Sequence, residues 1–358
     1  MAPKISVCIP AYNRPDTLYD LLQSVVSQDY DDFEVVISED HSPRAKEIEA
    51  VVNRFIEAYP GIKFRLFLNE ENLGYDENFR SLLSRTTGSF CVYMGDDDLM
   101  LPGALQKIGE IIDKYDNLGI ILRSWCIIDR ETRETMELFR YFSMDRFFPS
   151  GNDSVIALFR RSVTISGFTV HRKSALKFST DQFDGTLLYQ LYLTLRILME
   201  RDGFYVSDVY FAVRKARTLV DQKHYFGSSK KEEGLFAPGV FSPQHSLNFM
   251  KGMLAIAKAA KSIKGVKGAE LFKRIIRDID NYSYPFMAMH RSRIGAKLFI
   301  KYVFDLVHIG FGRTFYFWTY FFMLLLLGES VSNRLINKIK WALGRTPALG
   351  GLYSGIEP

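Results

Sequence analysis

The first hundred residues alternate between short apolar runs and amphipathic segments, which limits the folds open to the chain. Four apolar runs predict β-strands, at residues 4–10, 33–38, 63–68 and 90–94. Three segments with helical spacing lie between them, at residues 15–28, 44–59 and 76–85. Strands that alternate with helices form a mainly parallel sheet with helices on both faces. We therefore expect an α/β fold whose ligands bind beyond the carboxyl ends of the strands.

An acidic triplet follows the last of these strands, in the sequence Gly95-Asp96-Asp97-Asp98. Three adjacent carboxylates repel one another unless a cation joins them. Asp96 and Asp98 offer hard oxygen ligands two residues apart, which suits a Mg²⁺ or Mn²⁺ ion that also holds the phosphates of a ligand. The alternative is an acidic turn that caps the helix expected to start near Pro102. The sequence has no Gly-rich dinucleotide motif and no phosphate-loop lysine, so neither of those ligand classes has support.

Four short motifs occupy strand ends or helix starts in a fixed order. They are Ile-Pro-Ala-Tyr-Asn-Arg at 9–14, Val-Val-Ile-Ser-Glu-Asp at 35–40, Asn-Leu-Gly at 72–74 and Gly-Asp-Asp-Asp at 95–98. Together they resemble the nucleotide-sugar-binding half of a family 2 glycosyltransferase with the GT-A fold, over residues 4–116. The helix at 75–80 is similar to that of the abequosyltransferase-like enzymes, which modify bacterial O-antigens. The chain departs from the family at 39–42, where Glu-Asp-His-Ser replaces the commoner Asp-Asp-Gly-Ser.

The resemblance implies that the first two motifs hold the base of a nucleotide-sugar donor. Asp40 would accept a hydrogen bond from the base, and the pocket would be lined by Pro10, Ala11 and Tyr12. Pyrimidine chemistry supports these residue types, because a carboxylate accepts from the ring N–H or amino group and a tyrosine ring gives a stacking face. The plainer alternatives are a turn-forming Asp40 and a partly buried Tyr12.

The resemblance also implies a metal site at the triplet. Asp96 would face the ribose or the metal, and Asp98 would bind the Mn²⁺ or Mg²⁺ ion directly. The wider donor site is expected to include Arg14, Asn72, Asn78 and Asp97. For Arg14 the alternative to a phosphate contact is a place at the start of the helix that follows it.

The catalytic base of the resembled family is an Asp in a Glu-Asp pair near the start of a helix. That position falls at residues 180–186 here, where no Glu-Asp pair exists. We predict Asp184 as the base, because it lies closest to the helix expected at 187–199, with Asp181 as the second choice. Either residue could instead cap the helix or form a turn.

Residues 117–245 are expected to hold the acceptor side of a catalytic domain that covers 1–245, with 1–116 as the donor side. An aromatic segment at 139–148 is predicted to be an irregular loop. A second loop, at 225–231, would close over the donor diphosphate or remain a plain solvated loop. Its candidate phosphate contacts are His224, Lys230 and Lys231.

Charge divides the chain unequally. Residues 251–358 hold 17 Lys and Arg against 6 Asp and Glu, whereas residues 1–250 hold 29 against 35. The basic residues flank apolar stretches at 298–307 and 314–327, and the unbroken apolar run at 315–327 is too short to span a bilayer comfortably. The two parts of the chain are therefore expected to meet different partners.

The region at 246–358 is predicted to be helical and to lie on or in an anionic membrane surface. Phe321, Leu324 and Leu325 are expected to contact lipid. The alternatives are a core helix, a dimer interface, or a spanning helix at 309–327. Nucleic acid is not expected as a partner, because a phosphate-binding surface does not need so long an apolar stretch.

The cysteines and the N-terminal residues indicate the cellular compartment of the protein. Cys8, Cys91 and Cys126 lie in apolar runs without disulfide or metal spacing, which predicts buried thiols in a reducing compartment. The N-terminus runs directly into the first strand, so we expect no secretory signal and a place on the cytoplasmic face of the inner membrane.

The sequence thus predicts an inverting, metal-dependent glycosyltransferase that acts on a polyprenyl-diphosphate-linked glycan in bacterial surface polysaccharide or glycoprotein glycan synthesis. Its partners would be a nucleotide-sugar donor, the lipid-linked acceptor and the membrane. Two rivals remain, a sugar nucleotidyltransferase and a catalytically inactive membrane-bound adaptor. The lack of a Gly-rich, cationic N-terminal loop counts against the first rival.

Overall fold

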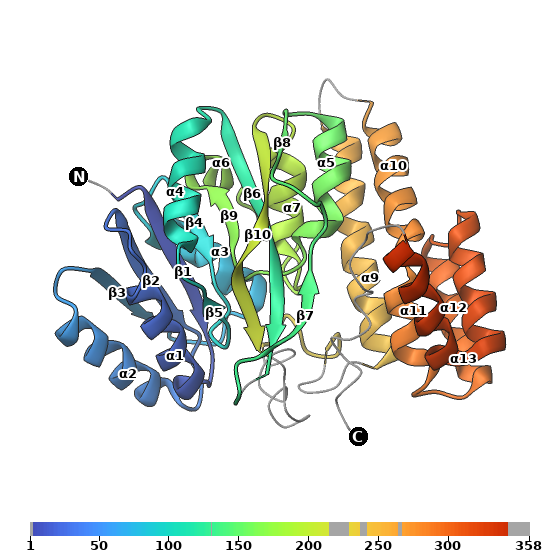
Figure 1. Ribbon diagram of the computed structural model, residues 1–358, viewed down its shortest axis with the longest axis horizontal. Helices are drawn as coiled ribbons and strands as arrows, with labels where there is room; N and C mark the ends of the chain where they lie inside the picture. Colours follow the sequence, from blue (N-terminus) through green and yellow to red (C-terminus); the bar gives the residue numbers. More distant parts are fainter. Residues whose placement is uncertain (1–2, 130, 215–228, 237–241, 264–266, 343–358) are drawn as a thin grey trace.

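The computed structural model describes residues 3–129, 131–214, 229–236, 242–263 and 267–342. Within these ranges ten strands form one sheet in the order β3-β2-β1-β4-β9-β6-β10-β5, with β7 attached to β6 and β8 attached to β10. Figure 1 shows this sheet at the centre of the molecule, with helices α9 to α13 gathered beyond one side of it. The chain therefore has the α/β architecture that its strand and helix pattern predicts.

The first four strands are parallel and lie where the apolar runs predicted them. They are β1 Ile5–Ala11, β2 Phe33–Glu39, β3 Lys63–Leu68 and β4 Phe90–Tyr93. The helices between them are α1 Pro15–Val26, α2 Ala45–Ala58 and α3 Tyr75–Arg85. β1 pairs with β2 and β4, and β2 pairs with β3. Because these strands run in one direction, the polar loops that follow β1, β2 and β4 meet at one edge of the sheet.

Residue types account for these elements. β1 and β2 are buried along almost their whole length, as their Val and Ile content requires for strands covered on both faces. α1 begins at Pro15, whose fixed φ suits the first helical position. The face of α1 that packs on the sheet carries the buried side chains Leu18, Leu21, Leu22 and Val25. Each such side chain stabilises the fold by roughly 1.5–3 kcal/mol through burial.

The second half of the sheet is mixed in direction. Its strands are β5 Leu99–Met100, β6 Leu118–Ile128, β7 Thr135–Phe139, β8 Arg146–Phe148, β9 Phe168–His171 and β10 Asp202–Arg214. The helices are α4 Ala104–Lys114, α5 Asn152–Leu158, α6 Arg172–Lys177 and α7 Tyr189–Ile197. β9 runs antiparallel between β4 and β6, whereas β6 and β10 are parallel. The three cysteines are buried, as predicted.

The segment at 139–148 is only partly the irregular loop that its composition suggested, since residues 140–145 are irregular but lie between two strands. It contains the end of β7 and all of β8, and both strands pair with the main sheet. The ring of Phe139 stacks on Trp125 of β6 with 4.0 Å between ring centroids. Aromatic side chains in this segment therefore pack against the sheet edge rather than mark a loop.

The C-terminal helices are α9 Pro243–Lys258, α10 Gly268–Asn281, α11 Tyr284–Arg291, α12 Ala296–Ile309 and α13 Phe315–Ala342. α9 packs on α7 and α10 packs on α5, so these helices adjoin the second half of the sheet. One hydrophobic cluster extends from Tyr189 in α7 through Leu254 in α9 to Leu324 in α13. The domain boundary predicted at 245/246 falls inside α9, within this shared core.

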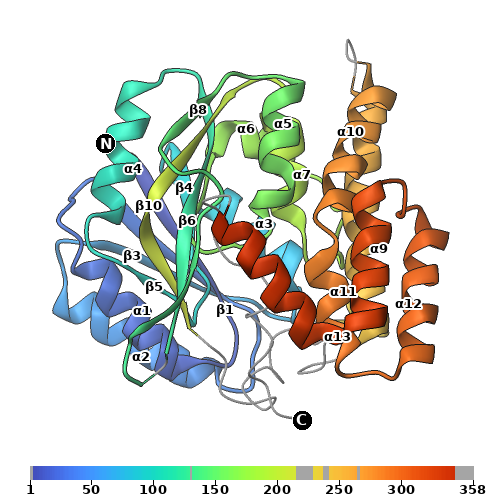
Figure 2. The same cartoon turned by 45° about the vertical axis from the view of Figure 1, so that its right-hand side comes forward.

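Helix α13 has one buried face and one exposed face, and it breaks at Gly328, where φ is 71°. Phe321 and Leu324, which we expected to meet lipid, are instead buried against the other helices. The outward side chains include Phe315, which is 81% exposed, and Leu326, which is 77% exposed. Figure 2 shows the two arms of α13 running in different directions.

Residues Phe315–Ile339 form a helix long and apolar enough, by length and composition, to cross a membrane. The break at Gly328 limits its first straight arm to residues 315–327, about 20 Å at 1.5 Å per residue. The hydrocarbon core of a bilayer is about 30 Å thick. The first arm alone is therefore shorter than that core is thick.

Asp280 fixes the start of α13, and its loss should destabilise the helical region. Its buried carboxylate accepts the backbone N–H groups of Gly312 at 3.1 Å and Arg313 at 2.7 Å. Asp280→Ala should lower the free energy of unfolding by about 1–3 kcal/mol, because both N–H groups lose their acceptor. Denaturant unfolding with Asp305→Ala as the control checks this prediction. Equal stability of the two variants would contradict it.

Candidate active site

The acidic triplet lies in a tight turn at the carboxyl end of β4. The backbone N–H of Asp98 donates to the carbonyl of Gly95 at 3.1 Å, which closes the turn. Asp96 is 2% exposed and Asp98 is 6% exposed, whereas the Asp97 side chain is partly open to solvent. Two of the three carboxylates are therefore held inside the protein, where an uncompensated charge is costly.

Asp96 joins the triplet to the loop after β1. One carboxylate oxygen accepts the backbone N–H of Tyr12 at 2.9 Å, and the other accepts Nη1 of Arg14 at 3.0 Å. The same guanidinium nitrogen lies 3.0 Å from Asp97. Burial raises the pKa of Asp96 to about 6, although the charge of Arg14 acts in the opposite direction. Tyr12, Arg14 and the triplet, which the resemblance placed in one site, are therefore in direct contact in the structure.

Asp98, at the end of the triplet, pairs with a serine. The hydroxyl of Ser166 donates to Asp98 and accepts the backbone N–H of Gly95 at 2.9 Å. The backbone N–H of Arg214, at the end of β10, lies 3.4 Å from the other carboxylate oxygen. Burial, followed by the charge of Asp97, raises the pKa of Asp98 well above its usual range. A nearby cation would stabilise the ionised form of this carboxylate.

The donor set of the triplet suits a divalent cation. Its carboxylate oxygens are the hard ligands that Mg²⁺ and Mn²⁺ prefer. Within the described residues no group of three or more His, Cys, Asp or Glu side chains forms a complete metal cage. Mg²⁺ is commonly held by one or two carboxylates plus substrate phosphates, so Asp96 and Asp98 fit a site that the donor completes.

Asp40 lies at the end of β2 and supports the turn before α3. Its carboxylate accepts Nδ2 of Asn69 at 2.8 Å and the backbone N–H groups of Leu73 and Gly74, each at 2.9 Å. Burial raises the pKa of Asp40 to about 6 against these hydrogen bonds. Asp40 therefore shapes the Asn-Leu-Gly motif at 72–74, and its contact with a base remains a prediction.

The other donor-site candidates surround this turn. The Asn72 side chain accepts the backbone N–H of Gly74 at 3.0 Å, and the buried Asn78 accepts the hydroxyl of Ser38 at 2.5 Å. In the loop after β1, Pro10 and Tyr12 are half-buried and Ala11 is fully buried. These residues border the same edge of the sheet as the triplet.

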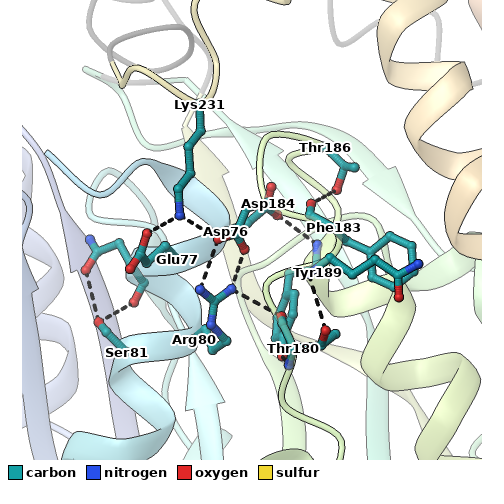
Figure 3. A network of polar contacts seen from close by, with 12 residues as sticks. Asp76, Glu77, Arg80, Ser81, Thr180, Phe183, Asp184, Thr186, Tyr189 and Lys231 are labelled. Atoms are coloured by element: carbon teal, nitrogen blue, oxygen red, sulfur yellow. Dashed lines mark hydrogen bonds and ion pairs between the residues drawn. The ribbon is translucent and has the colours of Figure 1, made fainter.

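Asp184 is enclosed by two cations, as Figure 3 shows. Both guanidinium nitrogens of Arg80 contact its carboxylate, with Nη2 at 3.0 Å, and Nζ of Lys231 lies 2.8 Å away on the other side. Lys231 also pairs with Glu77 of α3. Burial acts to raise the pKa of Asp184, but the hydrogen bonds from Arg80 and Lys231 outweigh it and hold that pKa below its usual range.

Asp181, the second choice for the base, is exposed and lies one turn earlier in the same loop. Of the loop cations, Lys231 is committed to the pairs with Asp184 and Glu77. His224 and residues 225–228 lie outside the described residues. The structure therefore brings Lys231 to the candidate base, 47 residues away along the chain.

Comparison with known proteins decides the family of the first half of the chain. Residues 6–176 match the family model for glycosyl transferase family 2. This part of the chain is a family 2 glycosyltransferase domain. Its sheet has the GT-A fold, as the resemblance implied.

Curated relatives resemble the glycosyltransferase domain over part of their own length. A Campylobacter jejuni GalNAc(5)-diNAcBac-PP-undecaprenol beta-1,3-glucosyltransferase is 33% identical over 131 residues, covering 33% of this chain and 41% of that protein. The Salmonella typhimurium abequosyltransferase RfbV is 35% identical over 116 residues, covering 32% and 34%. The chain thus spans well under half the length of these relatives.

Solved structures resemble the chain over almost its whole length. S. aureus TarS 1-349 in complex with UDP has a TM-score of 0.59 at 14% identity, covering 99% of this chain and 100% of that one. The mannosyltransferase PcManGT from Pyrobaculum calidifontis, in complex with GDP-Man and Mn²⁺, has a TM-score of 0.52 at 15% identity, covering 93% and 88%. At these identities the likeness shows the fold.

Sequence reasoning missed three side chains that contact the candidate site residues or their neighbouring segments. Ser166 binds Asp98, Glu232 accepts the backbone N–H of Tyr75 at 2.7 Å, and Asp76 accepts the backbone N–H groups of Leu187 and Tyr189. Asp76 stands at the first turn of α3, where an acid is ordinary, so its role in capping α7 left no sequence signal. Ser166 and Glu232 make long-range contacts that no local pattern reveals.

The pH dependence of turnover tests whether Arg80 and Lys231 keep the pKa of Asp184 low in the working enzyme. Its pKa lies below that of a free Asp, near 3.9, so the carboxylate stays ionised across pH 5–8. We expect kcat/KM to show no inflection from Asp184 in this window. Lys231→Met removes one of the two cations that lower the pKa of Asp184. The fall of kcat/KM at acidic pH should therefore begin at a higher pH in this variant than in wild type.

Variants identify the base independently. Asp184→Asn should keep nucleotide-sugar affinity and lose most turnover, because a base acts on the acceptor. Asp181→Asn serves as the matched control, since it changes an exposed Asp in the same loop. An inactive Asp181→Asn beside an active Asp184→Asn would assign the base to Asp181. Full activity of both variants would contradict a base in this loop.

Proposed function

We propose that the protein is an inverting, metal-dependent glycosyltransferase that moves a sugar from a nucleotide-sugar to a lipid-linked glycan acceptor. The observation that carries this proposal is the acidic triplet at the end of β4, with Asp96 and Asp98 buried, tied to the loop after β1 by Arg14 and Tyr12 within a family 2 domain. Enzymes of this kind need a diphosphate site and a base site close together. The candidate base Asp184 contacts Arg80 of α3, and the triplet lies at the carboxyl end of β4.

The donor side would use the loops at the carboxyl edge of the sheet. Asp40 would accept from the base, and Tyr12 would offer its ring as a stacking face beside Pro10 and Ala11. A solved structure of the same fold, S. aureus TarS 1-349, is in complex with UDP-GlcNAc, which supports a nucleotide-sugar as the donor class. Asn72, Asn78, Asp97 and Arg14 would form the surroundings of the ribose and diphosphate.

Asp96 and Asp98 would hold a Mn²⁺ or Mg²⁺ ion, which when bound offsets the charge on the leaving nucleotide diphosphate. The candidate base, Asp184 or Asp181, would take the proton of an acceptor hydroxyl. The hydroxyl oxygen then forms a bond to the anomeric carbon as the bond to the diphosphate breaks on the opposite face, which inverts the configuration. General-base assistance of this kind typically contributes about 10²–10⁴-fold in rate.

The acceptor proposal rests on the exposed face of the C-terminal helices. Outward apolar side chains on α12 and the first arm of α13 are Leu298, Phe304, Phe315, Tyr316, Phe322, Leu326 and Leu327. Exposed cations on α12, in the loop before α13 and on the second arm of α13 are Lys297, Lys301, Arg313, Arg334 and Lys338. An apolar face bordered by cations suits an anionic membrane surface. The Campylobacter relative, named for an undecaprenol-linked substrate, supports a polyprenyl-linked acceptor.

The cytoplasmic face of a bacterial inner membrane is where nucleotide-sugars and anionic lipid meet, so we propose that location. The product would then enter a surface polysaccharide or glycoprotein glycan, of which O-antigen is one class. The abequosyltransferase relative supports that class.

A thermal-shift screen of nucleotide-sugars tests the donor site. A donor present at 100 times its Kd should stabilise the protein by about 2.7 kcal/mol in the presence of Mn²⁺. Chelator should remove most of this shift, because the triplet and the diphosphate share the cation. Stabilisation by nucleoside triphosphates and sugar 1-phosphates, with none by nucleotide-sugars, would favour the nucleotidyltransferase alternative.

A further inference from the structure

Arg123, in the middle of β6, is a fully buried guanidinium without a carboxylate partner among the described residues. It is 2% exposed, and its Nε and Nη1 atoms have no hydrogen-bond partner in the described part of the chain. Burial lowers the pKa of Arg123 to about 10. A buried charge of this kind is costly, and in folded proteins it is normally paired or coordinated.

The one nitrogen of Arg123 that is engaged holds the segment that carries Ser166. Nη2 donates to the backbone carbonyl of Thr164 at 3.0 Å and to that of Ser166. The hydroxyl of Ser166 in turn accepts from the Gly95 backbone and donates to Asp98. A continuous set of hydrogen bonds thus runs from Arg123 through Ser166 to the triplet.

Gly167 shows that the turn is shaped around this guanidinium. Its φ is +80°, and a Cβ at this position would lie 2.6 Å from the ring of Phe211 and 2.8 Å from Nε of Arg123. Any side chain at 167 would push the guanidinium or the ring aside. The backbone at Gly167 therefore lies too close to Arg123 and Phe211 to carry a side chain.

Asp98 is also the carboxylate whose charge acts on Arg123, alongside the phenols of Tyr141 and Tyr205. Arg14 borders the triplet from the loop after β1, while Arg123 approaches it from β6 through Ser166. The two arginines thus reach the triplet from different elements, Arg14 through Asp96 and Arg123 through Ser166.

We propose that Arg123 is a positioning residue for the metal ligand Asp98, acting through the backbone and hydroxyl of Ser166. Arg123 holds the 164–167 turn, the turn presents the Ser166 hydroxyl, and the hydroxyl orients the Asp98 carboxylate for the cation. This inference rests on the proposed metal-dependent function. Residues that orient metal ligands typically contribute about 10–100-fold to metal affinity.

The test is Mn²⁺ binding, measured as a Kd by electron paramagnetic resonance with Mn²⁺ alone. Ser166→Ala and Arg123→Met should each raise this Kd about tenfold, and the double variant should exceed the larger single effect only slightly, since both act through one contact. Arg123→Lys keeps the charge and one donor, so it should fall between Arg123→Met and wild type. Arg201→Met is the matched control, because Nη1 of Arg201 also donates to a backbone carbonyl, that of Leu118, at 3.0 Å.

The Mn²⁺ affinities of these variants decide whether the inference holds. Wild-type affinity in Ser166→Ala and in Arg123→Lys would overturn the inference, even where Arg123→Met does not fold. An equal loss of affinity in Arg201→Met would overturn it too, because the effect would then be a general loss of structure. A wild-type protein that binds no Mn²⁺, either alone or with a nucleoside diphosphate present, would reject metal dependence in the proposed function itself, an outcome distinct from unchanged variants.

Discussion

Asp98→Asn should fold normally and lose sugar transfer by about 100-fold or more. A metal contributes several kcal/mol to leaving-group stabilisation, and each 1.4 kcal/mol corresponds to about a tenfold change in rate. The amide keeps the size of the side chain and can still accept the Ser166 hydroxyl, so the turn at the end of β4 should survive. Initial rates of nucleotide diphosphate release, with Mn²⁺ at saturation, measure the effect.

The control for Asp98→Asn is Asp113→Asn, which changes an exposed carboxylate that pairs with Lys4 beside the start of β1, at the other end of the parallel strands from the triplet. This control should keep wild-type rates, and chelator should inactivate it as it does wild type. Full activity of Asp98→Asn in the presence of chelator would end the assignment of the triplet as a metal site.

Replacing Phe315, Phe322 and Leu326 with Ser should release the protein from anionic vesicles. These three side chains are exposed on the first arm of α13, and each contributes roughly 1.5–3 kcal/mol when buried in an apolar environment. Membrane partitioning should therefore fall at least 100-fold. Activity on a polyprenyl-linked acceptor should fall more than activity on a short-chain analogue. Cosedimentation with vesicles that contain anionic lipid measures the release.

The matched control replaces Leu68, Met136 and Met144 with Ser. These side chains are also apolar and exposed, but they lie in the sheet half of the chain. This control should bind vesicles as wild type does. High salt should weaken wild-type binding without abolishing it, since basic residues add roughly 1 kcal/mol each near anionic lipid. A wild type that ignores anionic vesicles and forms a dimer through the α13 face would contradict membrane docking.

The parallel half of the fold was predictable because each of its elements has a clear apolar period. β1, β2 and β4 end where polar residues begin, so the positions of Asp40 and Asp96 at the sheet edge followed from chain direction alone. The direction of β9 did not follow, since the sequence of a four-residue strand does not show which way it runs until its neighbours in the sheet are known.

Local sequence patterns did not predict the partners of the candidate base or of the candidate metal ligand. Arg80 and Asp184 are 104 residues apart, and Asp98 and Ser166 are 68 apart. Spacing along the chain carries no information on such contacts, because they depend on how α3, α7 and the sheet pack. The same limit applies to α13. Its long apolar run does not show which face is buried, because that depends on how α10 to α12 pack against it.

The most direct test of the account is transfer itself, measured with the full chain on anionic vesicles that carry a polyprenyl-diphosphate-linked glycan. With Mn²⁺ and a panel of nucleotide-sugars, one donor should yield nucleoside diphosphate and extended lipid-linked glycan in equal amounts. Magnetic resonance of the product should show an anomeric configuration opposite to that of the donor. Retained configuration would contradict the inverting mechanism, and bound donor with no release above hydrolysis would contradict the enzyme and favour an inactive adaptor.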